Sequence, residues 1–207
     1  ELARQVCELR YEKLRGVKAS IAPILWQHGA ISRLGPDDDI LKAIDERGFT
    51  VTIGYSGLYE TVKYLTGQSH TTEEGFAMAE WIMRYLRDML GNFKINQPHL
   101  RFALYGTPQE STTGWFSEKL RARFGDVPDI TDKGWITNSY HVDIREEIDA
   151  FEKLNIEGAL QRYSTGGAVS YVETSPLYNN VGAVLKLYDH MYETSIYSEI
   201  NFESDVC

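Results

Sequence analysis

Short runs suited to β-strands alternate with longer runs suited to helices over the second half of the chain. We expect strands at 100–105, 134–142, 167–173 and 195–201, and helices at 112–124, 144–154 and 178–193. Strands separated by helices of this length form β-α units, in which successive strands lie largely parallel. The alternation therefore predicts an α/β fold. Ligands of such folds bind at the carboxyl ends of the strands, in the loops that enter helices.

The first half of the chain is predicted to be mostly helical. Apolar spacing and capping residues indicate helices at 2–15, 39–47, 57–66 and 71–90, and the β-branched run at 49–54 indicates a strand. No repeat, low-complexity segment or flexible linker divides the sequence. We therefore expect residues 1–207 to form a single domain.

The composition argues against several classes of function. The chain carries 21 basic and 30 acidic residues, a net charge of −9, with the basic residues scattered, which argues against a protein that binds nucleic acid. No apolar run approaches the ~18–20 residues of a membrane helix, and the N-terminus lacks the pattern of a signal peptide. The two cysteines, Cys7 and Cys207, lie at opposite ends, which favours a reducing cytoplasm.

A hydroxyl-rich loop between the strand at 100–105 and the next helix is the strongest candidate for a binding site. The candidate residues around it are Tyr105, Gly106, Thr107, Glu110, Ser111, Thr112, Thr113 and Gly114. Backbone N–H groups at a helix start, the helix dipole and several hydroxyls together form an anion site. The alternative is a simple helix cap, because Ser and Thr cap many helices. A carboxylate at Glu110 would repel an anion and fits better beside a sugar hydroxyl.

Three further polar side chains are candidates for a pocket: His28, Asn138 and His141. Strict alternation along a strand could place Asn138 and His141 on opposite faces, so they need not act together. A lone histidine is more often structural than catalytic. The Gly166-Gly167 pair permits close approach to a ligand or to another strand, and the alternative is a bulge or the entry to a strand. No Walker loop, paired-cysteine motif or zinc-protease motif accompanies these residues.

Several segments, in this order, resemble the catalytic subunit of class III (anaerobic) ribonucleoside-triphosphate reductases, which are glycyl-radical enzymes. The segments are Ala22–Ala30 (APILWQHGA), Ile53–Thr61 (IGYSGLYET), Tyr105–Ser111 (YGTPQES), Thr131–Ser139 (TDKGWITNS) and Ile200–Cys207 (INFESDVC). The resemblance spans nearly the whole chain and corresponds to the C-terminal half of that subunit. The third and fourth segments together are more specific than either alone.

The resemblance implies a ten-stranded α/β barrel, of which this chain supplies an incomplete part. It implies an oxidoreductase that reduces ribonucleoside triphosphates by glycyl- and thiyl-radical chemistry, with formate or a thiol as reductant. It also implies zinc, ATP and dNTP effectors, a radical-SAM activating enzyme and a homodimer, acting in deoxyribonucleotide synthesis for DNA replication. Tyr105 matches an active-site tyrosine, with Glu110 beside it, and Gly106–Gly114 matches the substrate-phosphate loop.

The radical-bearing segments of the family have no counterpart in this sequence. The glycyl segment and the thiyl cysteine are missing, so we expect a domain truncated at both ends that is inactive alone. Cys207 matches the first zinc-ribbon cysteine and would bind metal only in the full-length parent, while Cys7 receives no radical role. The alternatives are a fragment of a pyruvate formate-lyase-like enzyme, which acts on small substrates without phosphate, and a non-catalytic piece of a split reductase.

Overall fold

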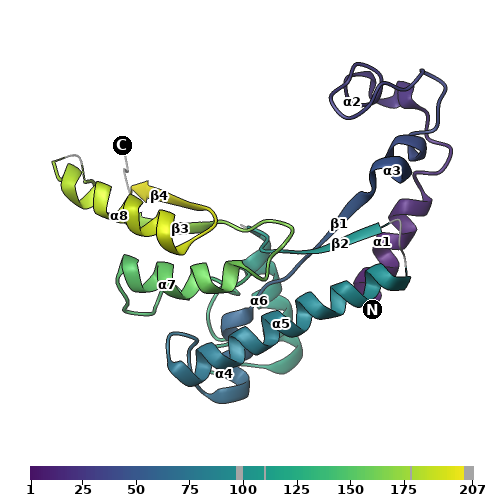
Figure 1. Ribbon diagram of the computed structural model, residues 1–207. Coiled ribbons are helices and arrows are strands. Elements are labelled where there is room, and N and C mark those ends of the chain that lie inside the picture. Colours follow the sequence, from purple (N-terminus) through teal and green to yellow (C-terminus); the bar gives the residue numbers. More distant parts are fainter. Residues whose placement is uncertain (97–99, 110, 178, 203–207) are drawn as a thin grey trace. The chain divides into compact units, whose positions relative to one another are not determined.

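A computed structural model describes residues 1–96, 100–109, 111–177 and 179–202 (Figure 1). In chain order its elements are α1 (Leu2–Glu12), the 3-10 helix η1 (Ala19–Ile21), α2 (Pro23–Trp26), α3 (Leu41–Arg47), β1 (Phe49–Gly54), α4 (Leu58–Thr66), α5 (Glu73–Asn96), β2 (Leu100–Tyr105), α6 (Thr112–Phe124), α7 (Ala150–Gln161), β3 (Ser170–Thr174), α8 (Val181–Thr194) and β4 (Ser198–Phe202). Within these ranges, no helix combines the length and apolarity needed to cross a membrane.

The chain divides into two compact units. Unit 1 consists of Glu1–Ile53 and Met89–Ala103, and unit 2 consists of Gly54–Asp88 and the chain from Leu104 onward. The described strands form two pairs, β1 with β2 and β3 with β4. The α/β class is therefore confirmed, while the ten-stranded barrel and its single domain over residues 1–207 stay predictions.

Unit 1 has its own hydrophobic core, built from α1, η1, α3 and β2. The buried residues of this core are Tyr11, Ala19, Ile40, Leu41, Ile44 and Leu100. Gly48 has a φ of 74° and ends α3, so that β1 begins at the next residue. Because left-handed backbone favours glycine, this boundary could be predicted from the sequence. The predicted bounds of β1 and β2 are confirmed.

Unit 2 contains a parallel β-α-β unit, as the alternation predicted. β3 and β4 pair in parallel, with Ser170 opposite Ser198 and Val172 opposite Ile200, and Figure 1 shows β4 returning beside β3 after α8. The apolar faces of α7 and α8 cover this pair. The buried residues of the resulting core are Leu154, Val172, Leu187 and Met191. The parallel arrangement is therefore confirmed for this strand pair.

The strand predicted at 134–142 is wrong. This segment consists of turns and irregular backbone, with one isolated antiparallel bridge between Asn138 and Ser56. Ser139 has a φ of 35°, which breaks an extended run. The helix predicted at 144–154 is α7, which begins only at Ala150, where the Asp149 side chain accepts a hydrogen bond from the Glu152 N–H. Residues from distant parts of the chain bury the polar side chains of this region. The local periodicity of a sequence cannot predict such long-range contacts.

Candidate functional site

A cavity of about 380 Å³ lies in unit 2, beside the irregular segment that replaces the predicted strand. The residues that line it are Thr113, Trp135, Ile136, Thr137, Asn138, His141, Val142, Asp143, Ile144, Glu146, Ile148, Lys153, Tyr171 and Glu173. Three of the residues predicted from the sequence therefore meet here: Thr113, Asn138 and His141. The alternation that could have separated Asn138 from His141 does not apply, because the segment is not a strand.

The hydroxyl-rich loop is tied to the wall of the cavity by Asn138. The Gln109 N–H donates a hydrogen bond to Asn138 Oδ1 at 3.0 Å, and the Ile136 N–H donates to the Thr113 carbonyl at 3.3 Å. A side-chain acceptor from the 131–139 segment therefore holds the loop just before α6 begins. This contact joins the two sequence segments that were most specific in the resemblance.

The start of α6 is open to solvent. Ser111 and Thr112 are exposed, and Thr113 and Gly114 are half-buried. The Thr112 N–H donates to the Gln109 carbonyl at 2.9 Å, and the Thr112 hydroxyl contacts the same oxygen at 2.5 Å. Ser111 occupies the N-cap position but makes no capping bond with its side chain. A simple Ser cap therefore does not account for the Ser111 hydroxyl.

The Gly166-Gly167 pair packs against the end of β2. The Gly166 N–H donates to the Leu104 carbonyl at 2.7 Å, and the Gly106 N–H donates to the Gly167 carbonyl at 2.9 Å. A methyl group on Gly106 would lie 2.9 Å from Cε1 of Tyr140, so this position requires glycine. The glycine pair therefore makes a close approach to the end of strand β2.

Tyr105 is half-buried, and its ring lies against Gly167, where an added Cβ would be 3.2 Å away. It is not among the described residues that line the cavity. The Thr107 N–H donates a hydrogen bond to the Tyr105 carbonyl at 2.9 Å, so the backbone turns sharply after Tyr105. Glu110 lies outside the described residues. The catalytic roles of Tyr105 and Glu110 therefore stay predictions.

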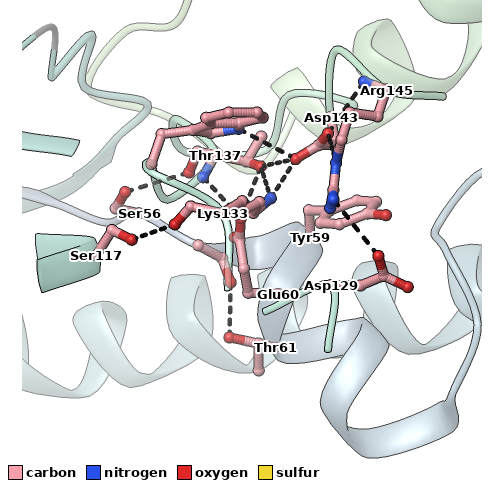
Figure 2. A network of polar contacts seen from close by, with 12 residues as sticks. Ser56, Tyr59, Glu60, Thr61, Ser117, Asp129, Lys133, Thr137, Asp143 and Arg145 are labelled. Carbon is pink, nitrogen blue, oxygen red and sulfur yellow. Dashed lines mark hydrogen bonds and ion pairs between the residues drawn. The ribbon is translucent and has the colours of Figure 1, made fainter. Parts of the chain in front are cut away.

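One wall of the cavity rests on a buried ion network (Figure 2). The Lys133 ammonium lies 2.5 Å from Glu60 Oε1 and 3.1 Å from the Thr137 hydroxyl, and it also pairs with Asp143. The charged side chains of Lys133, Glu60 and Asp143 are 2%, 6% and 0% exposed. Charges buried this deeply are tolerated only when they are paired, as these are, although Glu60 Oε2 has no hydrogen-bond partner among the described residues.

The network fastens the 131–143 segment to α4. Glu60 accepts hydrogen bonds from the Thr137 N–H at 2.8 Å and from the Thr137 hydroxyl at 2.7 Å. At the start of α4, the Gly57 N–H donates to the Thr137 carbonyl at 2.9 Å, and the Leu58 N–H donates to the Ser139 carbonyl at 3.2 Å. These contacts hold Asn138 where it can bind the loop.

Asp143 is a structural anion of the cavity wall. Burial alone would raise the pKa of Asp143, but the hydrogen bonds from Lys133 and Arg145 outweigh it and lower this pKa to about 2. Arg145 Nε lies 3.1 Å from Asp143 Oδ1, and Trp135 Nε1 donates to Oδ2 at 3.3 Å. Because this carboxylate stays ionised and its oxygens are occupied, it is unsuited to act as a general base.

Lys133, Glu60 and Asp143 are not among the site residues predicted from the sequence. Lys133 and Glu60 lie in segments that carry the family resemblance, yet their pairing joins positions far apart in the chain. Lys133 stands between Asp132 and Gly134, and Glu60 between Tyr59 and Thr61, so neighbours along the chain do not indicate that these charges are buried.

The remaining predicted residues lie elsewhere. His28 is exposed in unit 1, whereas the cavity is lined by residues of unit 2. Cys7 is half-buried on α1, and burial raises the pKa of its thiol. Cys207 lies outside the described residues, and among the described ones no three His, Cys, Asp or Glu side chains form a metal-binding cluster. Metal binding by Cys207 and a pocket role for His28 stay predictions.

The whole chain matches one family of known proteins. The family model described as anaerobic ribonucleoside-triphosphate reductase matches residues 1–207. The chain is 33% identical to the protein of that name from Escherichia coli K12 and 34% identical to that from Enterobacteria phage T4, and each alignment covers 100% of this chain. The alignments cover 29% and 33% of those relatives, so the chain spans about a third of their length.

Crystal structures of the anaerobic ribonucleotide reductase from Thermotoga maritima have a similar fold. The structure with dATP bound in the specificity site aligns with a TM-score of 0.64 at 18% identity, over 99% of this chain and 31% of that one. The structure with citrate in the active site aligns with a TM-score of 0.62 at 17% identity, over 96% of this chain and 32% of that one. At these identities the likeness establishes the fold alone.

Proposed function

Because the chain belongs to the anaerobic ribonucleoside-triphosphate reductase family, we propose that it forms part of an oxidoreductase that reduces ribonucleotides to deoxyribonucleotides. The chain spans about a third of the length of its relatives, so this activity is proposed for the complete protein. Because deoxyribonucleotides are the precursors of DNA, this activity would supply DNA replication. The family match over residues 1–207 argues against the pyruvate formate-lyase-like alternative.

Within that enzyme, the loop Gly106–Gly114 binds the phosphates of a ribonucleoside triphosphate. The observation that supports this role is the solvent-open start of α6, where Ser111 and Thr112 are exposed beside a cavity that Thr113 lines. The positive end of the helix dipole and the exposed hydroxyls favour an anion at this position. Asn138 keeps the loop in place through the Gln109 N–H.

Tyr105 and Glu110 are proposed to lie near the sugar of the bound nucleotide. A glycyl radical supplies the one-electron chemistry in this family, and formate or a thiol supplies the reducing electrons. The residues of this chain bind and orient the substrate. Family membership also underlies the proposed ten-stranded barrel, a homodimer in the cytoplasm and activation by a radical-SAM enzyme. Zinc held in part by Cys207 is proposed on the same ground.

Nucleotide effectors are proposed as well. The Thermotoga maritima enzyme has been crystallised with dATP in its specificity site and in complex with dATP and CTP. ATP and dNTP effectors of the complete protein would agree with these complexes. The effector site would be distinct from the substrate loop, because an allosteric effector changes the affinity for substrate from a second site.

Acidic substitutions at the start of α6 test the phosphate loop. In the complete reductase, Thr112→Glu and Gly114→Glu should each raise the substrate KM about tenfold or more, because a charge-assisted hydrogen bond contributes roughly 1.5–3 kcal/mol. The matched control is Ala122→Glu, which adds the same charge at an exposed position near the other end of α6. An unchanged KM in both loop variants would contradict the proposed phosphate site.

A further inference from the structure

His141 is held rigidly at the edge of the cavity. Its Nδ1 atom lies 3.1 Å from Oε2 of Glu157, a carboxylate on α7 that is fully buried. The imidazole stacks on the Tyr140 ring, with centroids 4.8 Å apart, and lies 6.1 Å from the Tyr171 ring. Since a histidine ring has few rotatable bonds, these contacts determine which way its second nitrogen points.

Glu157 determines which ring nitrogen of His141 carries the proton. Burial would raise the pKa of Glu157, but His141 and Lys153 outweigh it and lower this pKa to about 2. The carboxylate also accepts from Lys153 Nζ at 2.8 Å and from the Val142 N–H at 3.0 Å. An ionised carboxylate only accepts hydrogen bonds, so Nδ1 must donate. In the neutral ring, Nε2 therefore carries a lone pair.

The cavity beside His141 suits a neutral ring better than an anion. Trp135 and Tyr171 line it with aromatic surface, and Ile144 and Ile148 line it with apolar surface. The charges of Asp143 and Lys153 are already paired inside the protein. Glu146 and Glu173 add negative charge to the lining, which disfavours an anionic ligand. Because Nδ1 is occupied, Nε2 is the ring nitrogen left to accept a hydrogen bond from a ligand.

We propose that this cavity binds the base of the nucleotide, with His141 Nε2 accepting a hydrogen bond from an N–H of that base. A nucleobase is planar, uncharged and rich in N–H donors, so it matches aromatic walls and a fixed acceptor. Thr113 belongs both to the cavity and to the loop proposed for phosphate, which connects the two ends of one ligand. The inference rests on the proposed phosphate site and extends it to a base-binding residue, with Glu157 as its positioning residue.

Nitrogen-15 NMR of the complete reductase, labelled at its histidines, tests the proposal without any substitution. The neutral ring of His141 should show a protonated Nδ1 and an unprotonated Nε2. Adding CTP should shift the Nε2 signal of His141 and leave the signals of His190 unchanged, since His190, on α8, contacts the Phe151 carbonyl of α7 instead. A spectrum with the proton on Nε2, or an unshifted His141 signal in the presence of bound CTP, would overturn the proposal.

A variant separates the base site from the phosphate site. His141→Ala should weaken CTP binding about three- to tenfold, the range for one hydrogen bond between neutral groups, and leave tripolyphosphate binding unchanged. His190→Ala is the matched control and should change neither the binding of CTP nor the binding of tripolyphosphate. If both ligands bind and His141→Ala affects neither, the base site is wrong and the phosphate loop stands. If neither ligand binds to the complete wild-type reductase, both proposals fall.

Discussion

Lys133 and Glu60 form a buried ion pair, with Nζ of the lysine 2.5 Å from Oε1 of the glutamate and both side chains almost completely shielded from solvent. Glu60 lies on α4, and Lys133 lies in the irregular segment that forms one wall of the cavity. The pair, together with Asp143, adds to the backbone hydrogen bonds that fasten this segment to the start of α4. The stability of the wall therefore depends on charge compensation.

Removing the cation should destabilise unit 2 strongly. Lys133→Met leaves Glu60 without its cation in a buried site, which is expected to cost about 3–5 kcal/mol in the free energy of unfolding. The matched control is Lys63→Met, since Lys63 pairs with half-exposed Asp129 at 3.8 Å and should cost under about 1 kcal/mol. Urea denaturation measures both variants. If both variants lose the same free energy of unfolding, the buried pair contributes no more to stability than the exposed one.

The buried histidine His70 should make stability depend on pH. Burial lowers the pKa of His70 to about 4, and neither ring nitrogen has a hydrogen-bond partner among the described residues. In the unfolded chain a histidine titrates near ~6.5. The stability that comes from keeping this ring neutral is therefore complete above about pH 6.5, and it is lost as the pH falls from about 6.5 to about 4.

Substitution of this histidine checks the effect. The pKa difference corresponds to about 3 kcal/mol at the acid end of the window. His70→Phe should keep the edge contact with Tyr59 and flatten the stability curve between pH 8 and pH 5. The carboxylates of Asp143 and Glu157 lose their contribution only at lower pH, between about 4 and 2. An equally steep decline in His70→Phe would assign the pH dependence to other groups.

Two glycines of the loop should respond oppositely to alanine. A Cβ on Gly106 would lie 2.9 Å from Cε1 of Tyr140 and 3.2 Å from Cβ of Ala168, so Gly106→Ala should cost about 1–3 kcal/mol of stability. Gly114 lies inside helix α6, and a Cβ added there would have only the Gly134 carbonyl oxygen within contact distance, at 3.6 Å. Gly114→Ala should therefore stabilise by roughly 0.5–1 kcal/mol. Thermal unfolding of the two variants measures the contrast, and a similar loss in both would refute the packing argument.

Asn138 should control the loop. In Asn138→Ala the Gln109 N–H loses its acceptor, so its amide hydrogen should exchange roughly three- to tenfold faster, as expected for one lost hydrogen bond. The control is Asn180→Ala, which removes a comparable side-chain bond to the Ala183 N–H at the start of α8. That variant should leave the exchange of Gln109 unchanged. If the two variants alter the exchange of Gln109 equally, the tie between Asn138 and the loop is not the cause.

Local chemistry alone determined the regular elements of this protein. The strands at 49–54 and 100–105 and the helix at 112–124 occur with the predicted bounds. Each has a glycine at one boundary: Gly48 precedes the first strand, Gly106 follows the second and Gly125 follows the helix. The loop after β2 could also be singled out, because hydroxyl residues at a helix start carry their own signal. Of its residues, Thr113 lines the cavity.

Only the tertiary structure decided the conformation of the 131–145 region and the wall of the cavity. Residues 134–142 have a strand-like sequence, yet they form an irregular segment that backbone hydrogen bonds and the ion network of Lys133, Glu60 and Asp143 fasten to α4. The same folding brings Asn138 and His141 to one cavity and seats His141 on Glu157. Sequence periodicity describes neighbours along the chain. The energy of a buried charge depends on partners that the chain supplies from distant positions, and the fold alone selects those partners.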